Sequence, residues 1–118
     1  MELTPEAEGP DDAERNASTR WEGGVAVVSV SGELDLATAP GVRTELEHVI
    51  RQGGEGLHVD LSDVGFVDST GLGVLVWAWE QARAQRMDYL VVNPSATAGR
   101  VLEQSGLARI FDVESDET

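Results

Sequence analysis

Hydrophobic residues in the central part of the chain change between the two-residue spacing of strands and the spacing of helices. Residues 25–30 are a β-branched run after two glycines, which predicts a strand joined by a tight turn to a shorter strand near 19–21. Residues 57–61 alternate strictly between apolar and polar, which predicts a strand with one buried and one wet face. Residues 89–92 predict a third main strand, and an edge strand is expected over 110–113.

Three predicted helices separate these strands. Pro40 opens the first, which runs to about residue 51 and has apolar positions on one face, at Val42, Leu46, Val49 and Ile50. The second is expected over 70–86, and the third over 95–105 with Gly106 as its C-cap. The order predicts an α/β fold: a small mixed sheet with a parallel βαβ core. Right-handed crossovers between neighbouring strands place the helices mainly on one face, which agrees with the half-wet central strand.

The helix predicted over 70–86 carries apolar residues on more than one side. At 100° per residue, four of them share the face that we expect to be buried, namely Leu72, Leu75, Val76 and Trp79. Val74 and Trp77 lie on nearly the opposite side, together with Gln81. They are ordinary surface residues, or are covered by the N-terminal segment, or form a docking patch for a partner. We favour the docking patch.

Composition removes several classes of function. The chain of 118 residues has 22 acidic and eight basic residues, a net charge of −14, and all eight basic residues are arginines. Such acidity argues against binding to nucleic acid, which needs a basic face. Without lysine there is no P-loop, no Schiff base and no lysine-dependent phospho-aspartate receiver site. Without cysteine there is no disulfide, thiolate metal site or thiol nucleophile.

The acidic residues concentrate at the two ends. Eleven of the 22 lie in 1–22 and 112–118, together with only two of the arginines. Residues 1–17 cannot bury enough apolar surface to fold, so we expect a disordered acidic tail there, a folded domain over 18–113 and a second acidic tail over 114–118. The chain shows no signal-peptide pattern and no apolar run long enough to span a membrane. We therefore expect a cytoplasmic protein with no membrane contact.

The junction between the strand at 57–61 and the following helix carries the most informative chemistry. Asp68, Ser69 and Thr70 stand in a row at the predicted helix N-terminus. Each is a common N-cap, and capping alone is the simplest explanation for one such residue but not for three. Gly71 and Gly73 follow in the first turn, where each costs about 1 kcal/mol relative to alanine and leaves the backbone open to close approach. A phosphate added to a hydroxyl here would be stabilised by the helix dipole, by roughly 0.5–2 kcal/mol.

Three motifs, in this order along the chain, resemble those of the STAS-domain anti-sigma factor antagonists of bacteria. They are Ser31-Gly32-Glu33-Leu34-Asp35-Leu36-Ala37-Thr38-Ala39, Asp68-Ser69-Thr70-Gly71-Leu72-Gly73, and Ser105-Gly106-Leu107 with Ile110-Phe111. The resemblance covers residues 18–113. It implies a STAS-like fold and a partner-switching function. In that family the unphosphorylated antagonist binds an anti-sigma factor that is itself a serine kinase, and so frees the sigma factor. Phosphorylation ends the binding, and a PP2C-type phosphatase restores it.

The resemblance also assigns roles to individual residues. Ser69 becomes the phosphoacceptor, and Asp35, in the loop expected after the first main strand, contributes to kinase recognition or phosphorylation. Together with the glycines and the docking patch, the expected partner surface comprises Asp35, Asp68, Thr70, Gly71, Gly73, Val74 and Trp77. The protein is then the substrate of a kinase and not an enzyme, with no cofactor and no metal. A phosphoserine adds roughly −1.5 to −2 charge beside Asp68 and near Asp63, which disfavours a docked partner.

Other functions were weighed against this one. A serine hydrolase is disfavoured because Val67-Asp68-Ser69-Thr70-Gly71 lacks the first glycine of a nucleophile elbow. His48 and His58 are expected on the surface and lack the spacing of a paired metal site. A nucleotide or small-ligand sensor would have only the helix start to hold phosphate. The alternative function is a STAS domain without a switch, as a scaffold in a signalling assembly or an accessory subunit of a lipid transporter.

Overall fold

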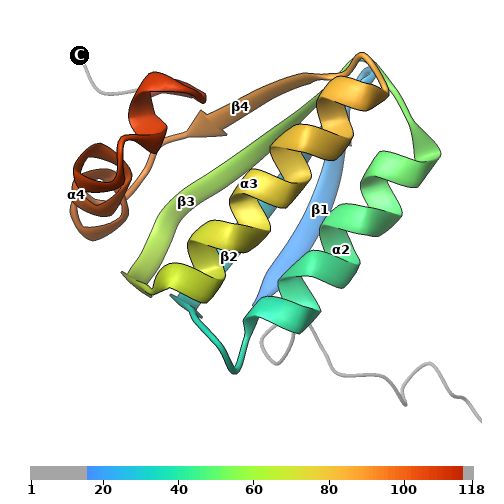
Figure 1. Ribbon diagram of the computed structural model, residues 1–118. Coiled ribbons are helices and arrows are strands. Elements are labelled where there is room, and N and C mark those ends of the chain that lie inside the picture. The colour runs from blue at the N-terminus through green and yellow to red at the C-terminus, as the bar shows by residue number, and fades with distance from the viewer. Residues whose placement is uncertain (1–15, 116–118) are drawn as a thin grey trace, which may run out of the picture.

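The computed structural model describes residues 16–115 and shows one mixed sheet of five strands (Figure 1). The strands lie side by side in chain order, and β1 is antiparallel to β2 while the other neighbours are parallel. Their bounds are β1 Ala17–Glu22, β2 Val25–Leu34, β3 Gly56–Val67, β4 Asp88–Val92 and β5 Asp112–Glu114. The predicted mixed sheet with a parallel core is confirmed.

Three helices connect the parallel strands: α2 (Ala39–Gln52), α3 (Ser69–Ala84) and α4 (Ala96–Ser105). Because the strand order follows the chain order, right-handed crossovers bring all three to the same side of the sheet. Figure 1 shows α2 and α3 side by side across that face. The helices and the sheet share a single apolar core, so the prediction of helices mainly on one face is confirmed.

Local sequence explains where the helices begin and end. Pro40 lies in the first turn of α2, where its missing N–H costs no hydrogen bond. Gly106 ends α4 in the left-handed conformation with φ of 86°, as expected for a C-cap glycine, and a short 3-10 turn follows at Leu107–Arg109. Arg51 and Arg83 lie in the last turns of α2 and α3, where a cation offsets the partial negative charge of a helix C-terminus.

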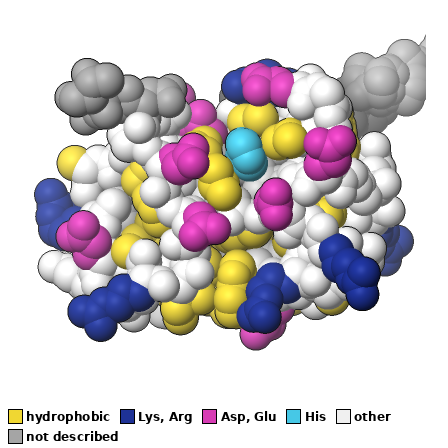
Figure 2. Space-filling view, turned by 90° about the horizontal axis from the view of Figure 1, so that it is seen from above, with side chains coloured by type: hydrophobic (Ala, Val, Ile, Leu, Met, Phe, Trp, Pro, Cys, Tyr) yellow, Lys and Arg dark blue, Asp and Glu magenta, His cyan; other side chains and the backbone are white. Residues whose placement is uncertain are grey.

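Charges alternate over the end of the molecule where α2 and α3 finish. Figure 2 shows this end, with arginine side chains along its margins and acidic side chains between them. The motif Asp68-Ser69-Thr70-Gly71-Leu72-Gly73 lies at the opposite end of the molecule, where α3 begins (Figure 1).

Two strands extend further than their local pattern predicts. Residues 62–67, which follow the strand predicted over 57–61, continue β3, and β2 continues past residue 30 to Leu34. The extension is possible because Leu34 pairs with Val67 and both side chains enter the core. The register shifts between Ser29 and Ser31 and again between Gly32 and Glu33, which re-aims the side chains near the strand ends. The motif of residues 68–73 follows directly after the lengthened end of β3.

The buried side of α3 differs from the predicted one. The residues that α3 buries are Gly71, Val74, Leu75, Ala78 and Ala82. Val74, expected on the exposed side, is only 8 % exposed, whereas Leu72, Val76 and Trp79 are half-buried. Leu75 is buried as predicted, but the rest of the predicted buried face is wrong, because α3 is covered on three sides. It rests on the sheet, has α2 along one flank, and packs Trp79 against Phe111, with ring centroids 6.1 Å apart, along the other.

The expected tails partly enter the sheet. Ala17 is the first residue of β1 and is buried in the core, and Glu114 is the last residue of β5. The remainder of both expected tails, residues 1–15 and 116–118, lies outside the described residues. Within the part of the chain that the structure describes, no helix is both long and apolar enough to cross a membrane.

Candidate functional site

Ser69 occupies the first position of α3 and its side chain is exposed. Among residues 16–115, its hydroxyl has no hydrogen-bond partner, and neither does that of the exposed Thr70 beside it. The strand β3 ends at Val67 and the helix begins two residues later, so the serine stands where the chain turns from the sheet into the helix. A nucleophilic oxygen at this position faces solvent at the positive end of the helix dipole.

Asp68 joins the start of α3 to the end of β2. It is the N-cap of α3, and its Oδ1 accepts a hydrogen bond of 2.9 Å from the amide of Gly71. Its Oδ2 accepts one of 3.2 Å from the amide of Leu36, and its own amide donates to the carbonyl of Leu34 at 3.2 Å. The capping explanation is therefore correct for Asp68. Through its bond to Leu36, the same carboxylate also holds the loop that follows β2 next to Ser69.

Asp35 organises the loop between β2 and α2. Its Oδ1 accepts hydrogen bonds from the amides of Ala37 at 3.0 Å and Thr38 at 3.1 Å. The hydroxyl of Thr38 donates to the carbonyl of Glu33 at 2.7 Å and closes the loop from the other side. The carboxylate of Asp35 is thus bound to its own loop. Its contribution to the site is to hold that loop in shape beside Asp68.

The two glycines of the first turn have opposite surroundings. Gly71 is buried, and a Cβ there would overlap the carbonyl oxygen of Leu34. Its lack of a side chain lets the start of α3 pack against the end of β2, so the close approach predicted for a partner is taken by the protein's own backbone. Gly73 is exposed, and nothing lies within 4 Å of where its Cβ would be.

Trp77 lies on the flank of α3 that faces α2. It lies eight residues along α3, which is about 12 Å of helix, and it is half-buried. The guanidinium carbon of Arg43, from α2, sits 4.2 Å from the centre of the Trp77 ring. Val74, the other apolar member of the predicted docking patch, is buried, so of the two only Trp77 keeps an exposed part.

Two exposed hydrophobic residues near Ser69 were missed by the sequence reasoning. Leu36 is 72 % exposed and Phe66 is 49 % exposed. Leu36 lies on the loop that Asp68 holds, and Phe66 lies near the end of β3, three residues before Ser69. The only signal in the sequence was that both stand within the recognised motifs or beside them. Their exposure depends on how the ends of β2 and β3 pair and on the path of the loop that follows β2.

Comparison with known proteins places the chain in a family. The profile of the STAS domain family matches residues 16–118. An anti-sigma-B factor antagonist of Listeria monocytogenes is 36 % identical over 90 residues, covering 76 % of this chain and 79 % of the relative. One of Bacillus subtilis is 34 % identical over 88 residues, covering 75 % and 80 %. The crystal structure of an anti-sigma factor antagonist from Mycobacterium paratuberculosis is similar at a TM-score of 0.77, with 32 % identity and 83 % of each chain covered. The chain belongs to the STAS-domain anti-sigma factor antagonists.

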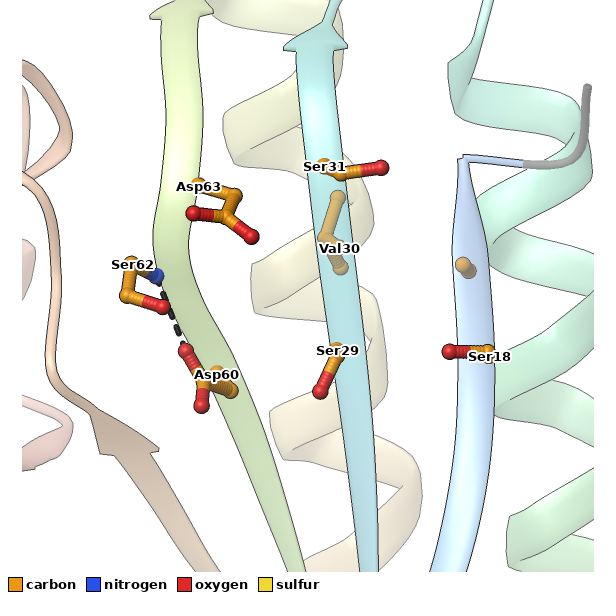
Figure 3. Close-up of a pocket in the computed structure, with 8 residues that line it drawn as sticks. Ser18, Ser29, Val30, Ser31, Asp60, Ser62 and Asp63 are labelled. Atoms are coloured by element: carbon orange, nitrogen blue, oxygen red, sulfur yellow. Dashed lines mark hydrogen bonds between the residues drawn. The ribbon is translucent and has the colours of Figure 1, made fainter. Parts of the chain in front are cut away.

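The uncovered face of this STAS domain holds a polar hollow, away from the start of α3. Figure 3 shows side chains from β1, β2 and β3 around it, and the volume is about 350 Å³. Its polar lining consists of Ser18, Ser29, Ser31, Asp60, Ser62 and Asp63. The amide of Ser62 donates to Asp60 at 2.9 Å. Asp63, expected near Ser69, instead lines this hollow, so its charge does not belong to the serine site.

Two histidines and one tyrosine are further titratable side chains of the antagonist. Over residues 16–115, no group of three or more His, Asp or Glu side chains is placed to hold a metal ion. His48 is exposed on α2, and His58 is half-buried on β3. Burial raises the pKa of Tyr89, whose hydroxyl donates to the carbonyl of Leu75 at 2.9 Å. That tyrosine joins β4 to α3 inside the core and is remote from solvent.

Proposed function

We propose that this antagonist binds an anti-sigma factor when Ser69 is unmodified and releases it when Ser69 is phosphorylated. The anti-sigma factor is itself the serine kinase, its capture frees a sigma factor, and a PP2C-type phosphatase resets the antagonist in the cytoplasm. One observation carries the proposal. In a chain whose relatives are anti-sigma-B factor antagonists, the exposed Ser69 stands at the start of α3, its hydroxyl has no hydrogen-bond partner within residues 16–115, and the preceding Asp68 is held by hydrogen bonds to Gly71 and Leu36.

The surroundings of Ser69 suit a phosphoacceptor and not a catalytic nucleophile. No base of residues 16–115 contacts its oxygen, so the kinase must take up the proton as the phosphoryl group is transferred. The first turn of a helix leaves amides without helical acceptors, and in α3 the amides of Gly71 and Leu72 are already bonded to Asp68. The amides of Ser69 and Thr70 remain to stabilise phosphate oxygens in the free antagonist.

The same geometry explains release. A phosphoserine adds roughly −1.5 to −2 charge next to Asp68, whose carboxylate cannot turn away because it caps α3 and holds Leu36. In the free protein, water screens this repulsion. Beneath a docked partner the charges are desolvated, so phosphorylation favours dissociation. Asp35 contributes by shaping the adjacent loop, and Thr70 flanks the acceptor without a bonded role of its own.

The proposal is tested by incubating the purified protein with ATP, Mg²⁺ and each anti-sigma factor kinase encoded in the same genome. We expect one phosphate on wild type and on Thr70→Ala, and none on Ser69→Ala, measured by intact mass and peptide mapping. The unphosphorylated protein should bind the same kinase at least tenfold more tightly than the phosphorylated protein or Ser69→Asp. Equal binding of all three forms would instead support a STAS scaffold without a switch.

A further inference from the structure

We propose that Leu36 and Phe66 are the apolar anchors through which the anti-sigma factor holds this antagonist. The inference rests on the function proposed above and deepens it, because it says which side chains the partner recognises besides Ser69. The partner surface that fits is an apolar patch with basic side chains around it, close to the nucleotide site of the kinase.

Neither side chain is part of the hydrophobic core. Leu36 and Phe66 are the two most exposed large side chains near the start of α3, and neither belongs to the core or to the half-buried residues that pack on it. The other exposed large apolar residues lie elsewhere: Trp21 near the turn between β1 and β2, and Ile110 and Val113 at the β5 edge. Exposed apolar residues at the end of the sheet from which α3 begins indicate an interaction surface.

The backbone holds both residues in position. The amide of Leu36 is bonded to Asp68, and the loop around it is closed by the hydrogen bonds of Asp35 and Thr38. Phe66 stands in the ladder opposite Glu33 and is followed by the buried Val67. Side chains presented on a fixed backbone lose little conformational freedom on binding, which is the property of an anchor.

The location of the pair matches the footprint of a partner that reaches Ser69. Phe66 precedes Ser69 by three residues, at most about 11 Å of chain, and Leu36 is bonded directly to the residue before Ser69. A standard interface covers about 800 Å² on each protein, a disc of roughly 16 Å radius. Leu36 and the strand end that carries Phe66 both lie within this radius of Ser69, so a kinase that covers Ser69 can reach both residues.

Charge on the same surface restricts the partner. Glu33 pairs with Phe66 and is exposed, while Asp68 lies beside Leu36. An apolar centre with carboxylates at its border complements a partner patch bordered by arginine or lysine. It opposes a second copy of this acidic chain, which would bring carboxylates against carboxylates.

The test compares two truncations with two matched controls. Leu36→Ala is paired with Ile110→Ala, since both remove an exposed aliphatic side chain, and Phe66→Ala is paired with Trp21→Ala, which removes an exposed aromatic one. For each variant we would measure the Kd for the anti-sigma factor kinase that phosphorylates wild type, and the kcat and KM of Ser69 phosphorylation. We expect Leu36→Ala and Phe66→Ala to raise Kd and KM at least tenfold with little change in kcat, and the controls to stay within twofold.

The outcomes separate this inference from the proposed function. If wild type is phosphorylated on Ser69 while both truncations bind like their controls, the anchor assignment is wrong and the switch stands. If wild type is neither bound nor phosphorylated by any kinase tested, both fail. Analytical ultracentrifugation of the protein alone tests whether a second copy of the chain binds this surface instead. If wild type is a dimer and Leu36→Ala is a monomer, the surface is a dimer interface and the anchor assignment is wrong. Should Phe66→Ala unfold, the Leu36→Ala pair decides the matter.

Discussion

Gly71 and Gly73 stand two residues apart in the first turns of α3, yet their surroundings impose different demands. At Gly71 the carbonyl of Leu34 occupies the space of a side chain, so only glycine allows the helix to begin there. At Gly73 the space is open and the conformation is helical, so glycine only lowers the stability of the helix. In the sequence the two positions look alike, and the neighbouring strand makes the difference.

This contrast predicts opposite effects of the same substitution. Gly71→Ala should lower the free energy of unfolding by about 1–3 kcal/mol, because the added methyl group forces the start of α3 away from β2. Gly73→Ala should raise it by about 0.5–1 kcal/mol, because alanine has the higher helix propensity. Urea unfolding followed by circular dichroism measures both. Equal effects at the two positions would show that α3 does not start against Leu34.

At the scale of the element, α3 shows why a single helical period was a poor guide. Apolar side chains surround most of this helix, so the centre of the hydrophobic arc does not identify its deepest side. Contact with α2 along one flank buries Val74 and half-buries Trp77, and contact with Phe111 half-buries Trp79 on the other. Only Gln81, of the three residues predicted to be on the wet side, is exposed.

Substitutions on the side of α3 that was predicted to be exposed should therefore differ in their effect on the free energy of unfolding. Val74→Ala should cost about 1–3 kcal/mol of unfolding free energy, because it removes buried methyl groups and leaves a small cavity. Gln81→Ala should change it by no more than about 0.5 kcal/mol, as at other exposed positions. Thermal unfolding of the two variants under the same conditions measures this difference. If Val74→Ala leaves the stability unchanged, the Val74 side chain is not buried.

At the scale of the whole molecule, the helices of residues 16–115 cover one face of the sheet, and a single core joins it to them. Tyr89 spans this core, since it comes from β4, bonds the carbonyl of Leu75 in α3, and packs its ring 5.4 Å from that of Phe111. The chain contains one tyrosine, no lysine and no cysteine. Few side chains therefore titrate above neutral pH. Because Tyr89 is buried between β4 and α3, its ionisation is linked to unfolding of the core.

Stability should fall in alkali through this tyrosine. Burial raises the pKa of Tyr89 in the folded state above its unfolded value near 10, so its contribution is complete below about pH 10 and is lost as the pH rises further. The slope should approach about 1.4 kcal/mol per pH unit, the value for one proton. Unfolding in urea between neutral pH and pH 11 measures it.

The matched control is Tyr89→Phe. It should lose about 0.5–1.5 kcal/mol at neutral pH, because one buried hydrogen bond to Leu75 is absent, and its stability should stay nearly level across the same alkaline range. An equally steep alkaline loss in Tyr89→Phe would mean that another group, and not this phenol, controls it.

The sequence by itself determined the order of elements, the mixed sheet, Pro40 in the first turn of α2, the C-cap Gly106, and the serine at the start of a helix. All of these depend on local periodicity and on backbone preferences of single residues, which the chain carries without its neighbours. Tertiary structure decided where β2 and β3 end and which side of α3 is buried. It also decided that Leu36 and Phe66 face solvent beside Ser69. Those features depend on strand pairing and on contacts between elements distant in sequence, which no local pattern encodes.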